Sequence, residues 1–161
     1  MKSKVAAPDH SLTVRLSSTR RGARLARRLV VAELDQWGFF PASPLAQAAE
    51  TVIAELVANA ITHGRSPGRD FGLSLTRTSD AIRIAVSDTR PERLPPEWGT
   101  LTVPPAEVDS GRGLLLVDAL AVRRGCDVRD TIVKTVWAEL ELPTGMTENH
   151  PCSEGRTRGG P

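Results

Sequence analysis

At residues 55–64 the chain reads ELVANAITHG, the last part of a segment with helical periodicity. Polar side chains recur here at every fourth residue, so one face of a helix would carry Glu55, Asn59 and His63. Asparagine is unfavourable inside a helix unless its amide makes an interaction. A carboxylate one turn from an amide oxygen can hold a hydrated Mg²⁺, although a solvated surface stripe would show the same spacing.

The helix that contains this segment is expected to run from about Leu45 to His63, where Gly64 ends it. Elsewhere, alternating and helical periodicities predict the order strand, helix, helix, two strands, helix, two strands. The other expected elements are a strand at 10–17, a helix from a cap at 17–19 to about 36, strands at 71–76 and 82–86, a helix at 114–121, and strands at 122–128 and 132–140. This order predicts an α+β two-layer sandwich, in which helices cover one face of a mostly antiparallel sheet.

The chain has 161 residues, enough for one domain with its own hydrophobic core. Residues 10–142 are expected to form that domain, and the polar segments 1–9 and 143–161 have the composition of disordered tails. Residues 89–110 contain five prolines and show no sustained period. A loop of this length inside a compact domain is usually functional or disordered.

The overall composition excludes several classes of protein. A net charge of +2, from 21 basic and 19 acidic residues, gives no reason to expect direct binding to nucleic acid or to an anionic membrane. Cys126 and Cys152 lack the spacing of zinc ligands. No stretch approaches the ~20 apolar residues of a membrane span, and the N-terminus lacks the pattern of a signal peptide. The sequence therefore predicts a cytoplasmic location.

Two further features have the chemistry to contact a ligand. Asp88 ends the apolar segment IRIAVSD, where a carboxylate can accept a hydrogen bond from a ligand amine; an ordinary loop aspartate is the alternative. A Gly111-Arg112-Gly113 turn precedes an apolar helix, and glycines there let backbone N–H groups approach a phosphate. A plain glycine turn is the alternative, since neither the Rossmann nor the P-loop pattern is present.

Arginines gather in the first predicted helix, at positions 20, 21, 24, 27 and 28. Helical spacing brings Arg20, Arg24, Arg27 and Arg28 close to one face. Such a face can be solvated, can bind an acidic protein partner, or can bind nucleic acid. Trp37 is the one nearby aromatic suited to base stacking, which gives single-strand binding little support.

Together these segments resemble the GHKL ATP-binding fold, which histidine kinases, gyrase-type ATPases and heat-shock chaperones share. ELVANAITHG resembles the N box of that fold, and Asp88 falls where its first glycine box begins. GRGL at 111–114 falls at the second glycine box, and Thr135 at the threonine of the last strand. The resemblance covers roughly residues 10–142. The short length and the ending KTVWAEL are similar to the anti-sigma factor serine/threonine-protein kinases of bacteria.

The resemblance implies a role for each matched residue. Asn59 would hold Mg²⁺ against the triphosphate, and Glu55 would be the general base for a substrate hydroxyl or a water. Asp88 would accept a hydrogen bond from the adenine amino group, with Thr135 supporting it. Residues 89–110 would form the ATP lid. The remaining nucleotide contacts are implied at His63, Gly111, Arg112, Gly113 and Leu114.

The resemblance also implies ATP and Mg²⁺ as cofactors, a sigma factor and an anti-sigma-antagonist protein as partners, and a homodimer. One departure matters: the family's first glycine box usually reads DxGxG, whereas Thr89-Arg90-Pro91 follows Asp88 here. Two interpretations therefore stay open. One is a serine/threonine kinase that acts on the antagonist protein, and the other is an ATP-sensing partner-switch module with little or no catalysis. A nucleic-acid-binding domain and a freestanding histidine kinase are the further alternatives.

Overall fold

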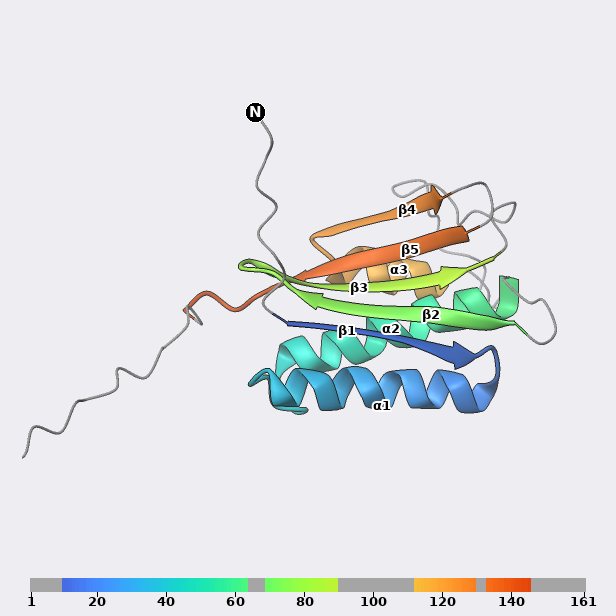
Figure 1. The fold of residues 1–161 in the computed structure, drawn as a ribbon. Coiled ribbons are helices and arrows are strands. Elements are labelled where there is room, and N and C mark those ends of the chain that lie inside the picture. Colours follow the sequence, from blue (N-terminus) through green and yellow to red (C-terminus); the bar gives the residue numbers. More distant parts are fainter. Residues whose placement is uncertain (1–9, 64–68, 90–111, 130–132, 146–161) are drawn as a thin grey trace, which may run out of the picture.

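The computed structural model describes residues 10–63, 69–89, 112–129 and 133–145 (Figure 1). These residues form five strands and three helices, in the predicted order. The elements are β1 (His10–Ser17), α1 (Arg20–Gln36), α2 (Pro44–His63), β2 (Asp70–Arg77), β3 (Ala81–Asp88), α3 (Arg112–Leu120), β4 (Arg123–Arg129) and β5 (Val133–Glu141). The tail predicted at 1–9 lies outside the described residues, as does the predicted lid from residue 90 on. Of the tail predicted at 143–161, the structure describes residues 143–145. Within the described ranges, no helix has the length and apolar character needed to cross a bilayer.

The five strands form one sheet in the order β1-β2-β3-β5-β4, and every neighbouring pair is antiparallel. The three helices cover one face of this sheet (Figure 1). Helix α2 packs against β3 and β5, α1 packs against β1 and α2, and α3 packs against α2. The predicted α+β sandwich is therefore confirmed.

Strand register separates apolar from polar side chains. In the central strands, Leu73 lies opposite Val86, and Val86 in turn lies opposite Val136, so alternate residues meet on the helix-covered face. These residues are buried and form the core together with apolar residues of α1 and α2. The other face carries Trp137, with the Arg83 guanidinium 3.9 Å from the centre of its ring.

Local sequence sets where the helices begin. The Thr19 side chain caps α1 by accepting a hydrogen bond from the Gly22 N–H at 3.1 Å. Gly22 is required there, because a Cβ would overlap the carbonyl oxygen of Ser17. Helix α3 begins at Arg112, two residues before the predicted start at Leu114. Gly113 therefore lies in the first helical turn, and the prediction of a turn through residue 113 is wrong.

Candidate functional site

The predicted site residues come from elements whose ends lie at the same end of the sandwich. Helix α2 and strand β3 end there, and α3 and β5 begin there (Figure 1). This arrangement follows from the chain direction, because α2 and β3 run one way along the sheet while α3 and β5 return. It brings together residues that are far apart in the sequence, such as Glu55 and Gly113, which are 58 positions apart.

Helix α2 positions two of the predicted residues. Glu55 and Asn59 are both half-buried and lie one helical turn apart, as the spacing predicts. His63 is the last residue of α2. Because the apolar side of this helix is buried in the core, Glu55 and Asn59 are held at the boundary between core and solvent.

The start of α3 lies directly against Glu55. A Cβ built on Gly113 would overlap Glu55 Oε2 and would lie 2.8 Å from Glu55 Cδ. Any larger residue at 113 would thus displace the carboxylate. The first turn of a helix is a favourable place for a negative charge, because unpaired N–H groups and the helix dipole face it. Arg112 is the first residue of this helix, Leu114 is buried in it, and Gly111 lies outside the described residues.

Asp88 is the last residue of β3 and lies on the helix-covered face, with an exposed fraction of 6%. Directly across the strand pair is Lys134 of β5, whose exposed fraction is 0%. The Lys134 Nζ lies 3.3 Å from Asp88 Oδ2. The carboxylate predicted to bind adenine is therefore part of a buried ion pair.

Thr135 does not point to Asp88. Its hydroxyl shares a hydrogen bond of 2.8 Å with the Ser87 hydroxyl. Since successive residues of a strand point to opposite faces, Ser87 and Thr135 lie on the face that the helices leave uncovered. The prediction that Thr135 supports Asp88 is therefore wrong, while nucleotide binding by Thr135 stays a prediction.

The chain beyond Asp88 is held from the opposite side of β3. Arg69, which precedes β2, donates a hydrogen bond of 3.1 Å from Nη1 to the Thr89 hydroxyl. Strand β3 lies between β2 and β5, so its C-terminal end has a cationic side chain on each side, Arg69 and Lys134. The family's glycines are missing at this point of the sequence, and side-chain contacts are found there instead.

Lys134 was missed by the sequence reasoning, although the sequence contains a signal for it. In the segment VKTVWAELE the buried positions of β5 are Lys134, Val136, Ala138 and Leu140, at a period of two. A lysine in the apolar phase of a strand needs a buried partner, because fully buried lysines are rare unless paired. Cys126 of β4 is also near this pair, and burial raises the pKa of its thiol.

The donor groups at this end of the molecule fit a magnesium–nucleotide complex. Mg²⁺ prefers oxygen ligands and usually takes one or two from the protein, with the rest from phosphates and water. Asn59 offers one such oxygen on α2. Within the described part of the chain, no group of three or more His, Cys, Asp or Glu side chains could hold a metal ion without a ligand's help. Asp88 supplies an acceptor for an amine, and Gly113 lets the start of α3 lie against the Glu55 carboxylate.

Comparison with known proteins agrees with the fold described above. Residues 16–137 match the family model described as the histidine kinase-like ATPase domain. No curated protein matches the chain. Among solved structures, the RsbU and RsbW domains of Rv1364c from Mycobacterium tuberculosis are similar to this chain, with a TM-score of 0.59 and 19% identity. The match covers 85% of this chain and 34% of that one, so this chain spans about a third of the length of that structure. Since the family model covers most of the sequence, the chain belongs to the histidine kinase-like ATPase domain family.

Proposed function

We propose that this protein binds ATP with Mg²⁺ and transfers the terminal phosphoryl group to a serine or threonine of an anti-sigma-antagonist protein, as part of a switch that controls a sigma factor. The observation that carries the proposal is the contact between Glu55 and Gly113. This contact supports the proposal because Glu55, the candidate general base, lies against the start of the helix whose N-terminus is expected to face the phosphates.

Each residue contributes a simple interaction. Asn59 would hold the metal, Gly113 lets the start of α3 lie against Glu55, and Asp88 would accept a hydrogen bond from the adenine amine. Glu55 then accepts the proton of the attacking hydroxyl. Bound MgATP supplies the phosphoryl group and the charge neutralisation on which phosphoryl transfer mainly depends. The protein's task is to position these groups, and rigid elements of the sandwich carry all four residues.

Calorimetry with ATP tests the first half of this proposal, with Mg²⁺ in one titration and EDTA in the other. We expect saturable binding that is tighter with Mg²⁺. Incubation with γ-labelled ATP and candidate antagonist proteins tests the second half, with mapping of the labelled residue. Absence of ATP binding would contradict the whole proposal.

A second function is favoured by the residues that follow Asp88. Thr89 is tied to Arg69 where the family usually has a glycine turn, so a nucleotide can be bound there without efficient turnover. The protein would then be an ATP-sensing partner-switch module. Tight ATP binding with no label on any partner would support this function over the kinase.

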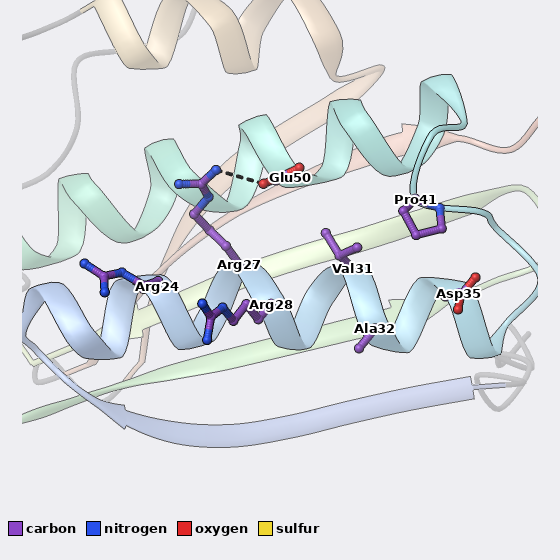
Figure 2. Close-up of a pocket in the computed structure, with 8 residues that line it drawn as sticks. All are labelled: Arg24, Arg27, Arg28, Val31, Ala32, Asp35, Pro41 and Glu50. Carbon is purple, nitrogen blue, oxygen red and sulfur yellow. Dashed lines mark hydrogen bonds and ion pairs between the residues drawn. The ribbon is translucent and has the colours of Figure 1, made fainter.

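The partner requires a surface of its own, and α1 offers one. Arg24, Arg27 and Arg28 line a groove of about 400 Å³ between α1 and the first half of α2 (Figure 2). The other lining residues are Val31, Ala32, Asp35, Pro41 and Glu50. Of the three arginines, Arg27 is the one with an ion pair to a described residue, 2.8 Å from Glu50. Basic groups next to apolar side chains suit an acidic segment of a partner protein that also carries apolar residues. We therefore assign the partner contact to this groove.

Reversing two charges tests this surface. The double variant Arg24→Glu/Arg28→Glu is expected to lose the protein that the wild type retains from a lysate of its native host in the presence of ATP. Arg15→Glu/Arg129→Glu is the matched control, because it makes the same change of net charge at two exposed positions of the sheet. Both variants should bind ATP as the wild type does. Retention of the same protein by the groove variant would refute the assignment, as would tight binding of a labelled DNA duplex with a steep salt dependence.

A further inference from the structure

The fully buried Lys134 is the feature for which neither the family resemblance nor the proposed chemistry accounts. It lies opposite Asp88 in the register of β3 and β5, and its ammonium is 3.3 Å from the carboxylate. Its neighbours in the same phase of β5 are the apolar Val136 and Ala138. Thus the pair is formed at the margin of the hydrophobic core and away from the charged face of the sheet.

Stability alone is a poor reason for such a pair. Removing two charges from water is costly, and well-packed apolar side chains in place of a buried ion pair are often neutral or stabilising. What the pair does achieve is to fix Asp88. An ammonium group 3.3 Å from one carboxylate oxygen favours the orientation that keeps this oxygen toward it.

The residues that follow Asp88 differ from the family pattern. In the family pattern, glycines follow the aspartate and shape the turn after it, but here Thr89-Arg90-Pro91 follows. The end of β3 is instead held by Arg69 on the β2 side and by Lys134 on the β5 side. Arg69 acts on Thr89, so Lys134 is the one of these two that contacts the carboxylate itself.

We propose that Lys134 is a positioning residue of the nucleotide site, which keeps Asp88 oriented to accept a hydrogen bond from the exocyclic amine of a purine. The inference rests on the proposed function, because it assumes that Asp88 contacts the base. It assigns base selectivity to a residue on a neighbouring strand that does not need to touch the nucleotide. Lys134 thus acts through Asp88 and has no catalytic role.

The test compares ATP with purine riboside triphosphate, which lacks the exocyclic amine but is otherwise the same. Calorimetry gives the ratio of the two affinities, and this ratio reports the amine contact and not general folding. For wild type we expect a ratio of about 10- to 150-fold in favour of ATP, the usual effect of a hydrogen bond to a charged group. The methionine side chain is similar in length to lysine but carries no charge. In Lys134→Met the ratio should therefore fall to within about threefold of unity.

Two further variants separate positioning from folding. Lys134→Gln keeps a hydrogen-bond donor in the strand and serves if Lys134→Met does not fold; we expect its ratio to fall at least about fivefold, because a neutral donor binds a carboxylate less strongly. Arg83→Met is the matched control, since it removes a cation from β3 on the uncovered face, where Arg83 pairs with Glu139. Its ratio should equal that of the wild type.

The possible results are distinct. A folded Lys134→Met or Lys134→Gln protein that keeps the wild-type ratio would overturn the inference and leave ATP binding intact. A wild-type ratio near unity with tight ATP binding would also overturn it, because Asp88 would then not contact the amine. No binding of either nucleotide by the wild type would instead remove the proposed function on which the inference rests.

Discussion

Replacing Glu55 by glutamine is expected to slow phosphoryl transfer to the protein substrate by roughly 10²- to 10⁴-fold, the usual contribution of a general base. The glutamine amide has nearly the shape of the carboxylate. It can therefore occupy the same space beside Gly113 without displacing the start of α3. ATP affinity should stay within about threefold of wild type, because proton abstraction matters in the transition state and not in nucleotide binding. Single-turnover transfer of label from γ-labelled ATP gives the rate, and calorimetry gives the affinity.

The matched control for this variant is Glu141→Gln. Glu141 is the exposed last residue of β5 and belongs neither to the predicted site nor to the arginine-lined groove. The control changes the net charge equally but should transfer phosphate at the wild-type rate. Equal rates for Glu55→Gln and wild type would show that Glu55 is not the base. Equal loss in both variants would point to a general effect of the lost negative charge.

Replacing Asn59 by alanine is expected to remove the dependence of ATP binding on Mg²⁺. Asn59 is the half-buried amide one turn after Glu55, and the proposed magnesium ligand. Losing a contact to a charged group should weaken binding of MgATP by about 10- to 150-fold. Binding measured with EDTA should hardly change, because no metal is then present to contact the amide. Titrations by calorimetry under both conditions provide the measurement.

Thr62→Ala is the control for the asparagine variant, since Thr62 is an exposed polar residue one turn further along the same helix. It should bind ATP as the wild type does, with and without Mg²⁺. If Asn59→Ala keeps a wild-type gain in affinity from Mg²⁺, the metal is bound elsewhere and the assignment of Asn59 is wrong. A loss of affinity that is equal in EDTA would show that the amide contacts the nucleotide directly.

The sequence predicted the architecture well, because periodicity reports on burial. Strand β5 alternates buried and half-buried residues, and α2 has a stripe of apolar residues at helical spacing. Both elements and their order could therefore be predicted from the sequence. The ends of the helices and strands were harder to predict from the sequence. The first turn of α3 contains Gly113, which approaches Glu55 closely, and that contact depends on how α3 packs against α2.

In the site too, contacts within one element could be predicted, and contacts between elements could not. Glu55 and Asn59 are neighbours on one helix, so local spacing was sufficient to pair them. Asp88 and Lys134 lie on different strands, 46 positions apart in the sequence, and become partners only through the register of β3 and β5. That register also shows that Thr135, one residue further along, belongs to the other face. Partners on neighbouring strands depend on how the strands pair, and a single sequence does not show that pairing.

The burial of Lys134 has a practical side for anyone who attaches this protein to a surface or a dye. The chain has 3 lysines, at positions 2, 4 and 134, against 18 arginines. Because Lys134 has an exposed fraction of 0%, amine-reactive reagents should modify Lys2 and Lys4 and spare the folded sandwich. Coupling through amines therefore tethers the molecule near residue 4, and the arginine-lined groove and the Glu55 end of the sandwich stay chemically unaltered for binding measurements.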